Sequence, residues 1–219
     1  MDFTTQRLMV AAGSGGSGNV SLLRTWFYVS NINTTIDASS TLPGMTWFVC
    51  MFKYGTGGGA SVPAPPTIDG IPLTLRISDT TYYADDGSAA AIYAAPISTG
   101  TASSVFAFQP ILGGYNNSHT GLYKVVGVDP LATISTYTVR KVSSFVGGNG
   151  ANSCSFVVAS SAKNGSQTNP NPPMDSDLMF NSLGADRFTG GVNLTYSYPI
   201  VNQLTCFMSL PYSVAPVGP

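Results

Sequence analysis

Aspartates that could bind a metal ion lie in two polar stretches of the chain. Residues 78–87 contain Asp79, Asp85 and Asp86, and residues 163–177 contain Asp175 and Asp177. Carboxylate oxygens are the ligands that Ca²⁺ prefers, but the spacing of these five residues matches no calcium-binding loop. Aspartate is also a frequent capping residue in turns. We therefore favour turn capping and predict no metal, with a Ca²⁺ site at these aspartates as the alternative.

The only histidine, His119, is the side chain best suited to acid–base catalysis. It lies among Asn, Ser and Thr in residues 113–120, a composition typical of a loop. A catalytic histidine needs a nucleophile and an orienting acid close by, and the sequence contains no G-x-S-x-G, H-E-x-x-H or C-x-x-C motif. We expect a solvated loop histidine, no catalytic residues and a chain that is not an enzyme.

A glycine-rich run near the start matches the G-x-G-x-x-G motif of dinucleotide-binding folds. Gly13, Gly15 and Gly18 occupy the three glycine positions, and Asp37 follows about 20 residues later, where such folds place a ribose-binding acid. The motif requires a helix directly after it, yet the following residues, VSLLRTWFYV, favour a strand. The run from Gly13 to Gly18 is therefore interpreted as a flexible joint, and no cofactor is predicted. A dinucleotide-binding enzyme remains a third hypothesis.

Two tyrosines and a loop rich in glycine and proline could form a binding surface. Tyr82 and Tyr83 are adjacent, and residues 55–66 contain Gly57, Gly58 and Gly59. Tyrosine rings stack on sugars, and they are also enriched where protein subunits meet. The sequence leaves both interpretations open: a glycan or receptor surface, or an interface between subunits.

Nucleic acid is a poorly supported partner for this chain. Arg140 and Lys141 are adjacent and could face a phosphate backbone, but the formal net charge of the chain is −1. Binding to a phosphate backbone requires clustered Lys and Arg. We interpret these two residues as part of a solvated strand face and predict no strong nucleic-acid binding.

The elements that position these residues are expected to be strands. The chain has 219 residues, 9% of them charged, and its acidic residues are all Asp. Glu, a strong helix former, is absent, and about ten short apolar runs alternate with loops rich in Gly, Pro and Asn. We predict an all-β, antiparallel β-sandwich, most consistent with a jelly roll. Its expected parts are an extended N-terminal arm (1–19), a single domain (20–212) and a C-terminal tail (213–219).

Several runs carry specific expectations. Residues 46–54 form the most apolar run and predict a central strand, residues 20–29 predict a strand buried on both faces, and residues 89–95 predict a strand or a single helical turn. Residues 191–210 alternate with a period of two on both sides of Pro199 and predict a hairpin. In its second strand, Leu204, Cys206, Met208 and Leu210 are expected to face the core, with the opposite uncharged polar face available to a neighbour.

The cysteines and the hydropathy of the chain bear on where it is made. Cys50, Cys154 and Cys206 are odd in number, widely spaced and set in apolar runs, so we expect buried, reduced thiols. No run approaches the roughly 20 apolar residues that span a bilayer, and the first residues lack a signal-peptide core. We expect intracellular synthesis and no membrane span.

Two short stretches resemble a known family. Met51-Phe-Lys-Tyr-Gly55 resembles a strand and turn of picornavirus-like capsid proteins, and residues 180–199, FNSLGADRFTGGVNLTYSYP, resemble their late Gly/Asp/Phe cluster and final strand. The resemblance implies a jelly-roll subunit of an icosahedral virion, synthesised in the host cytoplasm, whose partners are copies of itself and other virion proteins. Our leading hypothesis is a structural subunit that acts by self-assembly. The alternative is a phage or surface module that binds a glycan or host receptor.

Overall fold

The computed structural model describes residues 20–27, 31–39, 46–55, 61–83, 86–99, 102–110, 118–128, 131, 133–140, 144–147, 153–161, 185–189, 192–195 and 203–211. Every regular element within these residues is a strand, which confirms the predicted all-β class. The described part of the chain contains no helix long and apolar enough to cross a membrane. The predicted arm (1–19), the tail (213–219), Gly57, Gly58, Gly59, Asp85, Lys141, Asp175 and Asp177 lie outside the described residues.

The strands form antiparallel sheets. They are β1 (Val20–Phe27), β2 (Ile32–Asp37), β3 (Thr46–Gly55), β4 (Thr67–Ile68), β5 (Ile71–Pro72), β6 (Thr74–Tyr83), β7 (Asp86–Pro96), β8 (Ser103–Phe108), β9 (Ser118–Val126), β10 (Ser135–Arg140), β11 (Ser144–Gly147), β12 (Ser153–Ser161), β13 (Ala185–Thr189), β14 (Val192–Thr195) and β15 (Gln203–Pro211).

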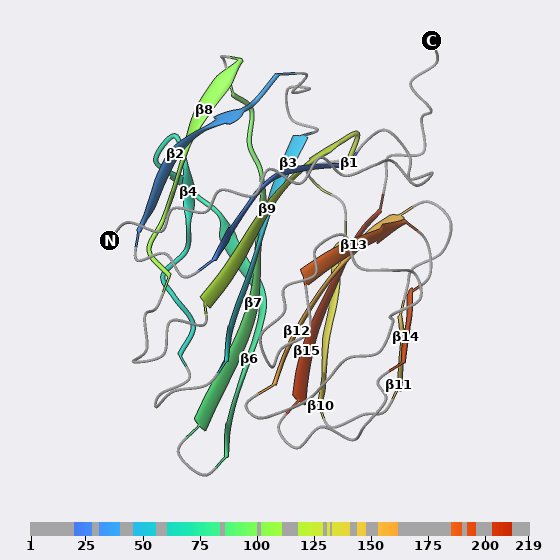
Figure 1. Ribbon diagram of the computed structural model, residues 1–219. Coiled ribbons are helices and arrows are strands. Elements are labelled where there is room, and N and C mark those ends of the chain that lie inside the picture. Colours follow the sequence, from blue (N-terminus) through green and yellow to red (C-terminus); the bar gives the residue numbers. More distant parts are fainter. Residues whose placement is uncertain are drawn as a thin grey trace.

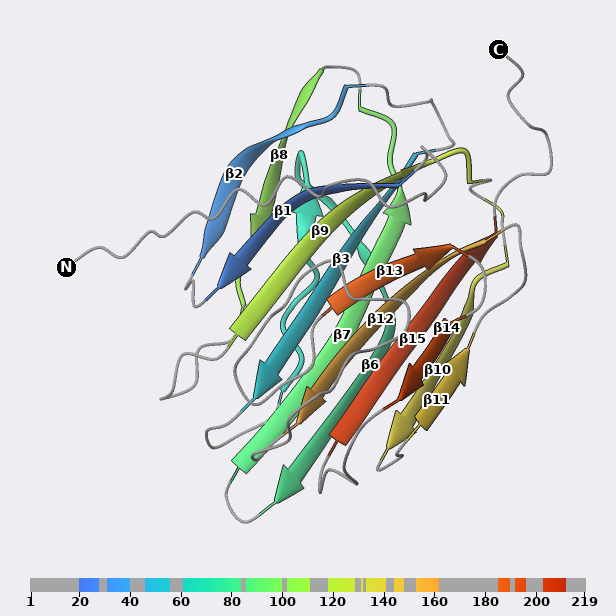
Figure 2. The ribbon, with the colours of Figure 1, turned by 45° about the vertical axis from the view of Figure 1, so that its right-hand side comes forward.

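Three of these sheets are stacked in layers (Figures 1 and 2). The central sheet has the order β1-β9-β3-β7-β6. One of its faces packs against a sheet of order β10-β15-β12-β13, here called the β15 sheet, and its other face packs against a sheet of order β2-β8-β4-β5, here called the β8 sheet. A fourth, two-stranded sheet pairs β11 with β14. The predicted antiparallel β-sandwich is confirmed, while the jelly-roll connectivity stays a prediction.

The central strand β3 divides its side chains between two hydrophobic cores. Its residues from Thr46 to Tyr54 are at most 1% exposed, as predicted for a central strand. Successive side chains of a strand point to opposite faces of the sheet, so Trp47, Val49 and Met51 face the β15 sheet while Phe48, Cys50 and Phe52 face the β8 sheet. A largely apolar sequence, with apolar residues at both odd and even positions, is therefore what this position requires.

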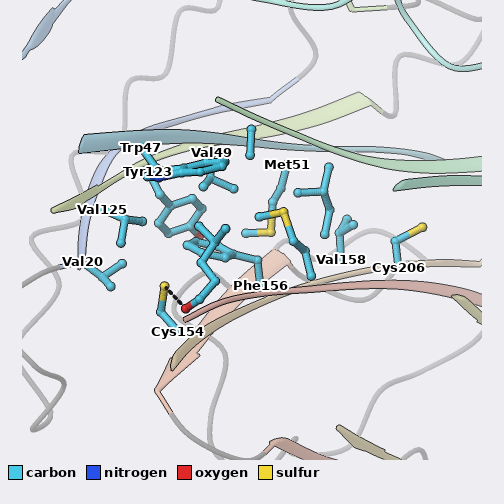
Figure 3. Close-up of a cluster of buried hydrophobic side chains, with 14 of the residues drawn as sticks. Val20, Trp47, Val49, Met51, Tyr123, Val125, Cys154, Phe156, Val158 and Cys206 are labelled. Carbon is cyan, nitrogen blue, oxygen red and sulfur yellow. Dashed lines mark hydrogen bonds between the residues drawn. The ribbon is translucent and has the colours of Figure 1, made fainter. Parts of the chain in front are cut away.

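The first core lies between the central sheet and the β15 sheet. Figure 3 shows the ring of Tyr123, on β9, beside that of Phe156, on β12, and their centroids are 5.7 Å apart in an edge-to-face arrangement. Cys154 lies near Val20 and Val125 at one end of this core, and Cys206 lies beyond Val158 at the other (Figure 3). All three cysteines are buried, as expected, and none of them forms a disulfide.

Strand β1 departs from its prediction. Residues 20–29 were expected to be buried on both faces, but the described strand ends at Phe27 and its residues from Leu22 to Trp26 are only partly buried. The reason is position: β1 is an edge strand of the central sheet, paired with β9 alone among the described strands. A run of β-branched and aromatic residues indicates a strand, but it does not distinguish an edge from a centre.

The predicted hairpin at residues 191–210 is wrong. Strand β14 pairs with β11, and β15 lies between β10 and β12, so both of its edges are already occupied. The predicted core face of β15 is confirmed, because Leu204, Cys206, Met208 and Leu210 all belong to the first core. On its opposite face, Thr205, Phe207 and Ser209 are also fully buried, so these positions are not left open to a neighbour.

Residues 78–87 were expected to form a polar loop, and this is also wrong. Strand β6 continues to Tyr83 and β7 begins at Asp86, with Tyr83 and Asp86 directly paired. For the ambiguous run 89–95 the strand alternative is correct. Its small alanines are divided between both cores, which lets sheets on either side approach β7 closely.

A tight turn joins β4 to β5. Ile68 pairs with Ile71, and the two residues between them, Asp69 and Gly70, have φ angles of 50° and 79°. This is the positive-φ geometry that two-residue hairpins favour. The carboxylate of Asp69 accepts a hydrogen bond from the backbone N–H of Val105 at 2.7 Å, which fixes the turn against β8.

Substituting Gly70 by alanine is expected to lower the free energy of unfolding by about 1 kcal/mol, because an L-residue is strained at this φ. No heavy atom lies within 4 Å of the added Cβ, so the cost is conformational rather than steric. Urea denaturation measures it. Gly70→Asn is the matched control and should cost less, since Asn tolerates positive φ; equal losses for both variants would contradict the explanation.

Candidate functional site

Four residues form a row across the central sheet near one of its ends, here called the polar row. Asp79 on β6 pairs with Ala90 on β7, Ala90 pairs with Lys53 on β3, and Lys53 pairs with His119 on β9. Directly paired residues of antiparallel strands project from the same face of the sheet. Ala90 belongs to the first core, so the row faces the β15 sheet.

The charged members of the polar row are buried. Lys53 is 1% exposed, His119 2% and Asp79 9%. Ser88 lies two residues before Ala90 on the same strand and is fully buried. The Cys206 thiol, on β15, donates a hydrogen bond to the backbone carbonyl of Ala90 at 3.6 Å, which connects the β15 sheet directly to the row. Charged groups are rarely buried to this degree, because taking them out of water is costly.

Burial also controls the charge of His119. Loss of hydration, and then the positive charge of Lys53, lower the pKa of His119 from 6.5 to about 3. The imidazole is therefore neutral at neutral pH. A neutral imidazole can accept a proton or bind a metal, but among the described residues no group of three or more His, Cys, Asp or Glu side chains could hold a metal ion.

The structure corrects the prediction for His119. His119 is instead the second residue of β9, which begins at Ser118, and it is only 2% exposed, on the face of the central sheet that carries the first core. The polar composition of residues 113–120 concealed the strand boundary, because Ser, His and Thr occur in loops and in strands alike.

The two described candidate aspartates, Asp79 and Asp86, lie on different strands. Asp79 lies inside β6 rather than in a turn, and its carboxylate accepts a hydrogen bond from the backbone N–H of Thr80 at 2.8 Å. Asp86 is the first residue of β7. The expectation that Asp79 caps a turn is therefore wrong.

The candidate binding residues share one end of the central sheet with the polar row. Strand β6 ends at Tyr83, and β3 ends at Gly55, which pairs with Ser88 near the start of β7. Strand β7 lies between Gly55 and β6, the strand that carries Tyr82 and Tyr83. Arg140, a separate candidate, is the last residue of β10 and pairs with Leu204.

The glycine motif lacks the element on which a dinucleotide site depends. Strand β1 begins at Val20, two residues after Gly18, where the motif requires the start of a helix.

Two lysines were missed as candidate residues. Lys53 interrupts the most apolar run of the chain, TWFVCMFKY, and Lys124 interrupts the apolar run LYKVV on β9. A single charged residue inside an apolar run could have identified them. When its apolar neighbours are buried in a core, the charged side chain is buried with them.

Lys124 has a structural role on the opposite face of the central sheet. Its Nζ donates hydrogen bonds to the backbone carbonyls of Ser39 at 2.5 Å and Asp37 at 3.5 Å, at the end of β2. Hydrogen bonds from Ser39, and then the charge of Lys124, lower the pKa of Asp37. Lys124 therefore joins the β8 sheet to the central sheet.

We expect Lys124→Met to reduce the free energy of unfolding by about 1–2 kcal/mol, since the charged hydrogen bonds are lost while the aliphatic stem is kept. Urea denaturation at pH 7 provides the measurement. Lys124→Arg, which retains charge and donors, should lose less. If Lys124→Met has the same stability as the wild-type chain, the hydrogen bonds of Lys124 do not stabilise the contact between the two sheets.

Both edges of the central sheet are irregular and carry an arginine. The register shifts between Leu22 and Arg24 on β1 and between Leu75 and Ile77 on β6. Arg76, within the second shift, donates to the carbonyl of Ala94 at 2.8 Å and lies over the ring of Trp47 at 5.4 Å. Bulges and charges at sheet edges disfavour the addition of another strand.

Comparison of the chain with protein-family models, with curated proteins and with solved structures found no match.

Proposed function

We propose that this chain is a structural subunit of a virus particle, with a jelly-roll form of β-sandwich, that acts by self-assembly. The observation that carries the proposal is a multilayered β-sandwich in a chain with only 9% charged residues. Interfaces between subunits are depleted of charge in their cores. The stretch that resembles capsid proteins, Met51 to Gly55, is the second half of the fully buried strand β3.

Assembly is expected to use faces and loops rather than strand addition. The edges of the central sheet are irregular, as described above. The outer face of the β8 sheet offers the exposed side chains of Asn33 and Thr35 on β2 and of Val105 on β8, which is 43% exposed, with Asp37 at the end of β2 as an exposed charge. Such a face is soluble on its own, and burying it against another subunit costs little free energy of desolvation.

Electron microscopy and size-exclusion chromatography of the purified chain, alone and with the products of neighbouring reading frames, test the proposal. We expect particles or large oligomers. Val105→Arg should leave the fold intact and weaken assembly, whereas Leu131→Arg, at a side chain 90% exposed, serves as the control for added charge. A wild-type chain that stays monomeric and joins no particle would contradict the proposal.

A second candidate, a glycan- or receptor-binding module, is favoured by the convergence of strand ends at Gly55 and Tyr83. Thermal stabilisation by a sugar, lost in Tyr82→Ala and kept in Leu131→Ala, would favour it over assembly. Absence of stabilisation across a glycan panel would count against it.

A further inference from the structure

We propose that the polar row is an acid-sensitive contact between the central sheet and the β15 sheet: protonation of His119 separates the two sheets at this end while the rest of the molecule stays folded. The inference does not depend on the proposed function, and its failure would leave that function untouched.

Lys53 is the neighbour of His119 in the polar row. Lys53 and His119 are directly paired on adjacent strands, so their backbones are about 5 Å apart, and both face the interior. Asp79 lies three strands from His119, about 14 Å across the sheet, on the far side of Lys53. The nearest charge to His119 within the polar row is therefore the cation of Lys53, and the row's only acid is closer to Lys53.

The strands next to the polar row carry further charged positions. Strand β7 places Ala90, Ser88 and its first residue, Asp86, at alternate positions in this region, and β1 pairs Phe27 with His119. On the β15 sheet, β12 and β15 present apolar residues to the central sheet, among them Val158 and Cys206. The described strands of that sheet also carry charged residues. Arg140 pairs with Leu204, Asp186 pairs with Val157, and Arg187 pairs with Phe156.

Adding a proton to His119 creates a second positive charge in the polar row. An imidazolium beside Lys53 places two positive charges in a region from which water is excluded, and like charges there repel strongly. Hydration of both groups relieves this repulsion, and hydration requires the β15 sheet to move away from the row. The central sheet itself remains covered by the β8 sheet, whose core contains no member of the row.

The size of the effect follows from proton linkage. His119 in the closed form titrates near pH 3 and in an open, hydrated form near 6.5. Acid therefore favours opening about tenfold per pH unit below 6.5, or about 30-fold at pH 5 compared with pH 7.5.

The three cysteines report on opening at three places. Cys206 contacts the polar row, Cys154 lies at the far end of the same core, and Cys50 lies in the core on the other side of the central sheet. Labelling with 4,4′-dithiodipyridine at pH 7.5 and pH 5, with mass spectrometry of each thiol, follows them separately. Rates are divided by those of the urea-unfolded chain at the same pH, which removes the pH dependence of the reagent.

We expect the corrected labelling rate of Cys206 to be about 30-fold higher at pH 5 than at pH 7.5. At pH 5 it should also exceed the rates of Cys154 and Cys50. Low concentrations of urea should leave it unchanged, because local opening exposes little additional surface. His119→Gln and His119→Phe should abolish the rise; either variant that folds serves as the comparison. Equal rates at the three thiols at pH 5, or a Cys206 rate that does not change with pH in the wild-type chain, would overturn the proposal.

Discussion

Phe156→Ala is expected to lower the free energy of unfolding by about 3–5 kcal/mol, the largest effect predicted for a single substitution in this chain. Phe156 is fully buried on β12 and contacts the ring of Tyr123 on β9, so it joins the β15 sheet to the central sheet. Removing the ring forfeits its burial and leaves a cavity that strands held by neighbours on both sides cannot close. Urea denaturation with fluorescence detection gives the change.

Two variants separate this mechanism from a general sensitivity to mutation. Phe156→Leu keeps most of the buried volume and should lose clearly less than the alanine variant. Leu131→Ala removes a side chain that is 90% exposed and should change stability by less than about 0.5 kcal/mol. Comparable losses for Phe156→Ala and Leu131→Ala would contradict the assignment of Phe156 to the core.

Lowering the pH from 7.5 to 4.5 is expected to remove about 2.5–3 kcal/mol of stability through His119 alone. Burial, and then Lys53, depress the folded-state pKa of His119 to about 3, whereas the unfolded chain titrates near 6.5. Below 6.5 the unfolded state therefore binds the proton and the folded state does not, so stability falls as the pH drops. The loss continues until the folded state itself becomes protonated near pH 3.

The single histidine makes this prediction easy to isolate. The aspartates also titrate at the acid end of the range, near pH 4 in unfolded chains. Their contribution cancels when the pH dependence of wild-type unfolding is compared with that of His119→Gln. If the two proteins lose stability in parallel as the pH falls, the folded state does not resist protonation of His119. That result would contradict the burial assigned to His119.

Much of the fold is predictable because strand periodicity is a local property. The apolar run of residues 46–54 indicated the central strand β3, and the alternation of Leu204, Cys206, Met208 and Leu210 indicated which face of β15 enters the core. The absence of Glu and the spacing of turn residues indicated an all-β chain. Each of these signals depends on residues close together in the sequence.

The candidate site was less accessible to sequence reasoning. Asp79 was assigned to a loop, His119 to solvent, and Lys53 was not singled out, yet pairing of four strands places all three in one row. The polar segments around Asp79 and His119 have loop-like composition. Their burial arises from neighbouring parts of the fold, and composition does not report on neighbours.

By itself the sequence determined the strand class, the central position of β3, the core face of β15 and the buried, reduced thiols. These follow from side-chain type and from the two-residue period of an extended chain. Only the tertiary structure decided that β1 is an edge, that β15 pairs with β10 and β12 rather than β14, and that Lys53 lies beside His119. Strand partners and register depend on which surfaces meet across long stretches of chain, and many pairings satisfy the same local alternation.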